Sequence, residues 1–179
     1  KRYTKALARS MAQTKQIKAA NILNNAFSVT TVSGDKQFLI DNDHPTIGGG
    51  NQTNRPTTLA DLSETSLEQA MIDIAAFKDE RGLKIAARGM KLIVPSANQF
   101  NAERILKSNQ RVGTSDNDIN ALSSKGMLPQ GYVVNNFLTD SDAFFIKTDV
   151  PNGLKHFQRA ALKTAMEGDF DTGNMRYKA

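Results

Sequence analysis

The sequence has 179 residues, of which 39% are hydrophobic and 23% charged, a composition typical of a folded globular protein. It contains no cysteine, which excludes disulfides and thiolate metal sites. No apolar run approaches the roughly 20 residues needed to cross a bilayer, and the sequence shows no run resembling the hydrophobic region of a signal peptide, so we expect no membrane partner. The chain starts at Lys1 rather than at a methionine, and its last residue, Ala179, falls within a pattern of secondary structure rather than after it. We therefore expect a fragment of a longer protein, or the ordered part of one.

The net charge of +5 is unevenly distributed. Residues 1–34 hold six basic side chains and no acidic one, whereas residues 35–80 hold nine acidic against three basic side chains. The basic segment could bind nucleic acid, or it could be a helix that faces the acidic segment of a neighbouring subunit. We favour the second interpretation, because no interleaved aromatic residues and no arginine cluster support recognition of bases or phosphates.

Residues 2–27 contain no proline or glycine and many strong helix formers, which predicts a long helix. Tyr3, Leu7 and Met11 are four residues apart and define one apolar stripe. Further along, apolar residues cover a wider arc, so we expect the end of the helix to be more enclosed. Residues 28–32, four of which are β-branched, are compatible with a strand.

Residues 41–56 are rich in Asp, Asn, Gly, Pro and Thr and predict a long loop, either functional or connecting two domains. A helix is predicted to begin within residues 63–66 and to stop at Gly82. Two pairs there have the spacing of a capping box, namely Thr65 with Glu68 and Ser66 with Gln69.

The second half alternates short apolar runs with polar loops. Residues 90–94 predict an interior strand that Pro95 ends, and Ser96 is placed to cap the following helix. After a polar loop at residues 107–130, two strands are predicted at 131–137 and 143–148. The tail is compatible with a helix or with strands, and we favour strands joined by a hairpin loop at residues 168–173.

Two motifs suggest a ligand site but lack its essential parts. The run Gly48-Gly49-Gly50 is not followed by a helix or by Lys-Ser/Thr, which a phosphate-binding loop requires, so a flexible loop is the better interpretation. The run Asp116-Asn117-Asp118 lacks the glycine and the terminal glutamate of a calcium loop. We therefore interpret the run, together with the nearby Asn120, as an N-cap before the turn at residues 119–122.

The sequence evidence for a catalytic site is equally weak. His44 and His156 are more than a hundred residues apart and have no cysteine or second histidine nearby in sequence. The aspartate pairs Asp140/Asp142 and Asp169/Asp171 lie in predicted turns, where Asp bonds its own backbone. The sequence predicts no catalytic residue, metal ligand or cofactor site, and hence no enzyme.

The order of short motifs along the chain carries more information than any one of them. The long basic helix ends in Ala19-Ala20-Asn21-Ile22-Leu23-Asn24-Asn25-Ala26-Phe27, and it is followed by Asp43-His44-Pro45, Asn54-Arg55-Pro56, Ala60-Asp61-Leu62-Ser63, Lys91 to Pro95, Leu138-Thr139-Asp140, Lys147-Thr148-Asp149, Gly153-Leu154, Phe157 and Arg159. In this order the chain resembles the major capsid proteins of tailed bacteriophages.

The resemblance implies an α+β fold with two domains. Residues 1–40 and 153–179 would form the peripheral domain, a long spine helix with an antiparallel sheet. Residues 41–55 would connect it to an axial domain at residues 56–152, a central mixed sheet flanked by helices. The N-terminal arm and extended loop that normally precede the spine helix, and the final strands after Ala179, are absent from this sequence.

The resemblance also implies a function: a structural subunit that assembles into pentameric and hexameric capsomers of an icosahedral head shell around the DNA genome. DNA would be a partner only as enclosed genome, and scaffolding, portal or decoration proteins are further expected partners. Such a shell assembles in the host cytoplasm and ends in the virion. The residues expected at subunit interfaces are Arg9, Lys15, Arg111, Gly113, Thr114, Asp116, Asn117 and Asp118, the last six in the loop expected at the capsomer axis.

Three alternatives remain open at this point. The shell protein of a bacterial encapsulating nanocompartment shares the same fold, and a basic nucleic-acid-binding protein would share the charge distribution. An enzyme using carboxylates alone is the third, because a fold does not determine a function.

Overall fold

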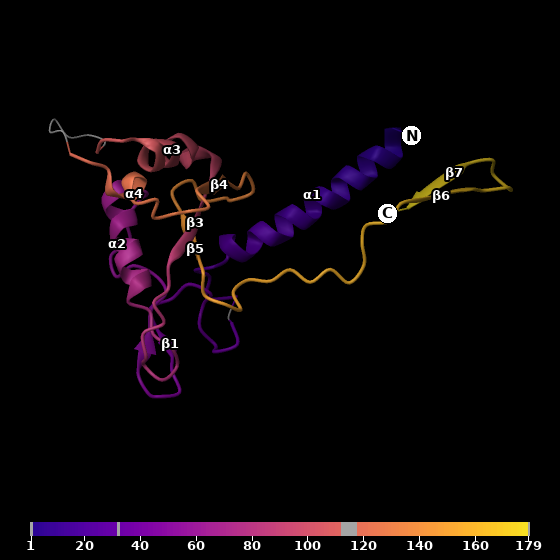
Figure 1. Ribbon diagram of the computed structural model, residues 1–179. Coiled ribbons are helices and arrows are strands. Elements are labelled where there is room, and N and C mark those ends of the chain that lie inside the picture. Colours follow the sequence, from indigo (N-terminus) through magenta and orange to yellow (C-terminus); the bar gives the residue numbers. More distant parts are fainter. Residues whose placement is uncertain (1, 32, 112–117, 179) are drawn as a thin grey trace.

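A computed structural model describes residues 2–31, 33–111 and 118–178. The fold is α+β: one long helix, α1 (Arg2–Asn24), and an extended C-terminal tail both project from a body of short helices and strands (Figure 1). The other helices are α2 (Glu64–Ala75), the short 3-10 helix η1 (Ser96–Asn98), α3 (Gln99–Lys107) and α4 (Ala121–Ser124). The strands are β1 (His44–Pro45), β2 (Asn51–Gln52), β3 (Gly89–Val94), β4 (Tyr132–Val134), β5 (Phe145–Thr148), β6 (Ala165–Gly168) and β7 (Met175–Lys178).

The body is built on a mixed three-stranded sheet in the order β4-β3-β5. Strand β3 is parallel to β4, with Leu92 opposite Tyr132, and antiparallel to β5, with Leu92 opposite Ile146. All three predicted strands are confirmed, although β4 and β5 are both shorter than predicted. Strand β5 begins two residues later than expected, and β4 ends three residues earlier. Strand β4 ends because Asn135 accepts a hydrogen bond from the Phe137 backbone N–H (3.0 Å) and forms a turn.

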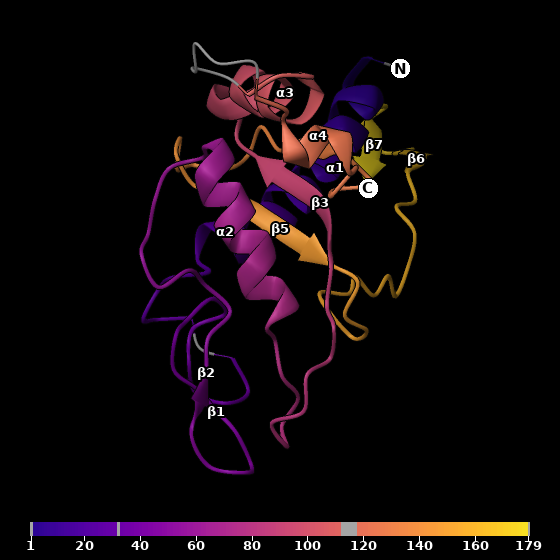
Figure 2. The same cartoon turned by 60° about the vertical axis from the view of Figure 1, so that its left-hand side comes forward.

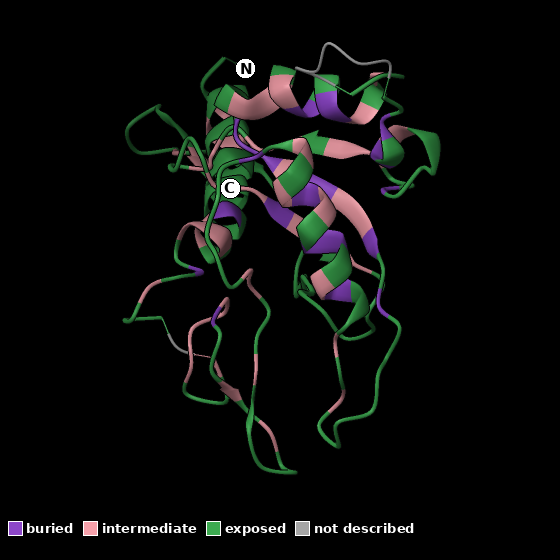
Figure 3. Cartoon of the chain, turned by 90° about the vertical axis from the view of Figure 1, so that its left-hand side faces the viewer, coloured by how far each residue is buried: buried purple, intermediate pink, exposed green. Residues whose placement is uncertain are grey.

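The hydrophobic core lies between this sheet and the helices packed on it (Figures 2 and 3). Its buried members come from α2, β3, α3, α4 and the loops beside them: Leu62, Leu67, Met71, Leu92, Val94, Ala102, Ile105, Leu122 and Leu128. Leu92 and Val94 are two residues apart in β3, so their side chains point to the same face of the sheet. The apolar run that predicted an interior strand therefore supplies the centre of the core.

Helix α2 begins where predicted but is capped by a different pair of residues. Ser63 Oγ accepts from the Ser66 backbone N–H (3.1 Å), and Ser66 Oγ accepts from the Ser63 backbone N–H (2.9 Å), a reciprocal capping box. The predicted stop at Gly82 is wrong, because the helix ends at Ala75. Gly82, with φ of 85°, instead serves a hairpin turn in which the Asp79 N–H bonds the Leu83 carbonyl (2.8 Å).

Helix α1 is confirmed but ends at Asn24, three residues earlier than predicted. The Asn24 side chain donates to the Phe137 carbonyl (3.0 Å) and accepts from the Thr139 N–H (3.1 Å), which joins the helix end to the body. Phe27 then stacks on Phe145 of β5 with ring centroids 6.1 Å apart. The possible strand over residues 28–32 is wrong for the described residues 28–31, which form turns.

The tail forms strands rather than a helix, as favoured from the sequence. Strands β6 and β7 are an antiparallel hairpin, with Met166 opposite Tyr177 and Glu167 opposite Arg176. Strand β7 contacts α1. Two segments at opposite ends of the chain therefore meet outside the body (Figure 1).

Candidate assembly surfaces

Helix α1 is exposed along most of its length. Ala20 is its only buried residue, and the expected interface residues Arg9 and Lys15 are both exposed. Among the described residues, neither side chain takes part in an ion pair. The apolar stripe is partly open, with Tyr3 79% and Met11 40% exposed and Leu7 half-buried. An amphipathic helix with a partly uncovered apolar stripe is typical of a surface that another chain covers.

The other expected interface residues lie in the loop between α3 and α4. Arg111 is held at the base of this loop, where its Nε lies 3.7 Å from Glu64 Oε2 at the start of α2. Its backbone N–H bonds the Asp118 carbonyl (2.9 Å), and Asp118 is exposed. Gly113, Thr114, Asp116 and Asn117 lie outside the described residues. The body with α3 and α4 lies on one side of the molecule, and the N-terminal end of α1 projects away from it on the other side (Figure 1).

Helix α4 is capped by Asn120 rather than by Asp118, so the expected N-cap is wrong at that residue, and Asp116 and Asn117 lie outside the described residues. The Oδ1 atom of Asn120 accepts from the backbone N–H groups of Leu122 (3.0 Å) and Ser123 (3.2 Å). Its Nδ2 donates to the Ile105 carbonyl (2.5 Å), and the residue is fully buried. Both polar atoms of the buried Asn120 side chain are therefore hydrogen-bonded, and the side chain links α3, through the Ile105 carbonyl, to the start of α4.

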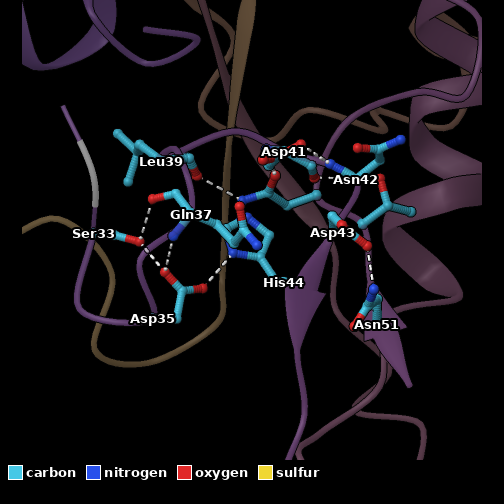
Figure 4. A network of polar contacts seen from close by, with 11 residues as sticks. Ser33, Asp35, Gln37, Leu39, Asp41, Asn42, Asp43, His44 and Asn51 are labelled. Atoms are coloured by element: carbon cyan, nitrogen blue, oxygen red, sulfur yellow. Dashed lines mark hydrogen bonds and ion pairs between the residues drawn. The ribbon is translucent and has the colours of Figure 1, made fainter. Parts of the chain in front are cut away.

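A polar network holds the segment between α1 and the β1–β2 hairpin (Figure 4). Asp35 is its centre: its carboxylate accepts from the Ser33 hydroxyl and from the Gln37 backbone N–H (3.1 Å), and its Oδ2 lies 2.6 Å from His44 Nδ1. These bonds, the Ser33 hydroxyl first and His44 next, hold the pKa of Asp35 well below its usual range. The network therefore fixes the loop best when the carboxylate is ionised.

The same three side chains do not form a catalytic triad. In a triad the hydroxyl bonds the imidazole, which a carboxylate orients from the other side. Here Ser33 and His44 both bond the carboxylate of Asp35, and His44 Nε2 is buried with no hydrogen-bond partner among the described residues. His156 lies in the exposed tail, so the fold does not bring the two histidines into one site.

The glycine run also has a structural use. Gly49 and Gly50, with φ of 82° and 90°, form the tip of the β1–β2 hairpin, and Thr46 N–H bonds the Gly50 carbonyl (3.1 Å). No helix follows, as a phosphate-binding loop would need. Within the described part of the chain, no group of three or more His, Asp or Glu side chains is placed to hold a metal ion.

Replacing Asp35 with asparagine is expected to destabilise the protein at pH 7 by at most about 1 kcal/mol, because the pair with His44 is partly exposed. The folded pKa lies below the ordinary 3.8, so the stabilisation is complete above that value, decreases as pH falls below it, and is lost as pH falls through the folded pKa. It should therefore be smaller at pH 3 than at pH 7. Urea unfolding of both proteins at pH 7 and pH 3 measures the difference. An equal difference at both pH values would contradict this account.

A long uncovered surface belongs to the tail. From residue 150 to residue 178 every residue is exposed except Asp169 and Tyr177, which are half-buried. The apolar side chains in this segment include Phe157 at 85% and Phe170 at 101% exposed, together with Leu154, Met166 and Met175. Sequence reasoning missed these as interface residues, although two phenylalanines in a polar, poorly periodic segment were a usable signal. A single copy of the chain leaves this surface in water.

No helix in the described part of the chain is long and apolar enough to span a membrane.

Comparison with known proteins identifies the family of the chain. The chain matches the family described as phage capsid protein over residues 1–179, and it belongs to that family. No curated protein matches it, and no solved structure matches it. Membership gives the protein a structural role in a virus particle, in a shell built from many subunits, and points away from an enzyme.

Proposed function

We propose that this protein is the major shell subunit of a tailed-bacteriophage head, and that it assembles with copies of itself into pentameric and hexameric capsomers of an icosahedral shell around the DNA genome. The observation that carries the proposal is the exposure of α1 and of residues 150–178, which lie outside the body's core. A subunit that leaves so much apolar surface uncovered gains stability when neighbours cover it.

The proposed subunit has a peripheral part and an axial part, which correspond to two parts of the fold. Helix α1 and the tail would form the peripheral part, with β7 against α1, and residues 56–152 around the mixed sheet would form the axial part. Residues 41–55, which contain the β1–β2 hairpin, would connect them. Head-to-tail contacts between unlike surfaces of neighbouring copies close into rings, which is the symmetry that a capsomer requires.

The loop whose base is formed by Arg111 and Asp118 would face the axis of such a ring. Assembly would take place in the host cytoplasm, with scaffolding, portal or decoration proteins as further partners. DNA would be enclosed without a dedicated binding site.

Electron microscopy and sedimentation of the purified protein test the proposal. Rings, shells or large particles are the expected result. A protein that stays monomeric at high concentration, with no particle under any assembly condition, contradicts it.

The charge of α1 provides a more specific prediction. Arg9→Glu and Lys15→Glu are expected to reduce the assembled fraction by at least about tenfold, because each reversal weakens a contact that recurs at every subunit by about 1 kcal/mol or more. Folding should change little, since both side chains are exposed and glutamate is a good helix former. Sedimentation measures assembly, and urea unfolding measures stability.

Arg9→Lys is the matched control, because it keeps the charge, and it should assemble like the original protein. Equal losses of assembly and of folding stability in Arg9→Glu would show that Arg9 acts within the subunit rather than between subunits.

A further inference from the structure

The β6–β7 hairpin has an open edge. Strand β6 pairs with β7 on one side, and no strand among the described residues pairs with its other side. The segment leading into it, residues 150–164, is exposed throughout. An isolated two-stranded hairpin is only marginally stable in water, and an open edge is a template for a further strand.

The backbone direction shows which residues of β6 face this open edge. The Asp169 N–H bonds the Asn174 carbonyl (2.8 Å) across the hairpin and therefore points toward β7. Because amide groups alternate along a strand, the groups of Gly168 and Met166 point the other way. An incoming strand must therefore hydrogen-bond to the even-numbered residues.

The charges along β6 indicate which strand that is. Glu167 lies in β6 and Lys163 two residues before the strand begins, and neither forms an ion pair among the described residues. If the strand continued back to Leu162, the two side chains would lie on the same side of the extended chain. Arg176, which lies opposite Glu167 in β7, is already paired with Asp169 (2.7 Å). One positive and one negative side chain are therefore left unpaired beside the open edge.

We propose that β6 is extended backward to residue 162 and that residues 162–168 pair antiparallel with the same residues of a second copy of this chain, centred on Ala165, so that Lys163 of each copy lies opposite Glu167 of the other. The pairing rests on the proposed self-assembly and names one of its contacts. It is isologous, with the same strand on both sides of a twofold axis, and it produces two charge pairs at once.

The backbone hydrogen bonds are compatible with this register. It places Thr164 opposite Met166 of the second copy, and Leu162 opposite Gly168, so that even-numbered residues meet even-numbered residues. The odd-numbered pairs are then the closely spaced, non-hydrogen-bonded ones, which suits Lys163 and Glu167. A register centred on Met166 would place Lys163 opposite Asp169, which Arg176 already occupies.

The pairing also enlarges an apolar surface. Met166 of β6 and Tyr177 of β7 are directly opposite, so their side chains lie on one face of the hairpin, and alternation places Leu162 and Met175 on that face as well. Joining two hairpins makes a four-stranded sheet whose apolar face is continuous across the twofold axis. Three or more strands with such a face are what independent stability requires.

A cysteine at the centre of the register tests it directly, because the chain has no other cysteine. In the assembled protein, Ala165 would lie opposite Ala165 of the second copy at about 4.5 Å between Cα atoms, which is within disulfide range. Ala165→Cys is therefore expected to form a covalent dimer on mild oxidation. Ala161→Cys is the control, because its two copies would lie roughly 26 Å apart in the same exposed segment and should not crosslink.

Charge reversal then tests the register. In the Ala165→Cys background, Lys163→Glu or Glu167→Lys alone should lower the yield of covalent dimer by at least about fivefold, because like charges then face each other twice. Mixing the two variants should restore it, since each mixed pair regains two opposite-charge contacts. Particles that form without an Ala165→Cys crosslink, equal crosslinking of Ala161→Cys, or no recovery in the mixture would each overturn the proposed pairing while leaving self-assembly intact. A protein that neither crosslinks nor assembles would overturn both proposals.

Discussion

Leu92→Ala is expected to lower the free energy of unfolding by about 3 kcal/mol, within the 2–5 kcal/mol range for removing a fully buried leucine. Leu92 is at the centre of β3, the middle strand of the sheet, with no exposed surface. Removing the Leu92 side chain leaves a cavity in a small core. Residues from both α2 and α3 belong to this core, and they cannot all move inward to fill the cavity. A loss of this size is a large part of the stability of a small domain.

Urea unfolding followed by circular dichroism measures the effect. Val133→Ala on the neighbouring strand β4 is the matched control, because Val133 is 43% exposed and should cost less than about 1 kcal/mol. Similar losses for the two variants would show that the core is not centred on β3. Assembly of Leu92→Ala should fail for lack of folded subunits, in contrast to Arg9→Glu, where folded subunits remain.

Asn120→Ala is expected to cost about 2–4 kcal/mol, although asparagine is rarely a core residue. Two losses combine: the N-cap of α4, worth about 0.5–2 kcal/mol, and the bond to the buried Ile105 carbonyl, whose loss costs about 1–3 kcal/mol. Asn120→Ser separates them, because serine can still accept from the helix N–H groups but cannot reach the Ile105 carbonyl.

Thermal unfolding of the two variants gives the measurement, and the serine variant should recover up to about half of the loss. Because Asn120 follows the loop expected at the capsomer axis, the alanine variant should also make that loop more accessible to protease. An Asn120→Ala protein as stable as the original would mean that the bond to Ile105 contributes nothing.

Local features of the fold were predictable from the sequence because neighbours along the chain determine them. The long helix before Asn24, the interior strand ending at Pro95 and the tail hairpin all follow from periodicity, absence of breakers and turn residues. The uneven charge was visible in the same way. These features already indicated a subunit with one exposed basic helix.

Other features depend on residues far apart in the chain. His44 meets Asp35 across a loop, Arg111 meets Glu64 across the body, and Asn24 reaches the carbonyl of Phe137. No spacing rule predicts such pairs, because their distances are set by how whole elements pack. The capping box of α2 was misassigned for a related reason: several Ser and Thr residues had suitable spacing, and the helix start decided between them.

The sequence by itself determined the class of elements, their order and the resemblance to a capsid subunit, because hydrophobic period and turn chemistry act over a few residues. Only the tertiary structure decided which surfaces remain free. It enclosed Asn120, paired Arg111 with Glu64, and left the tail and the edge of β6 exposed. The physical reason is that burial is a property of the packed chain: a side chain is available to a neighbour only if its own fold has not already covered it.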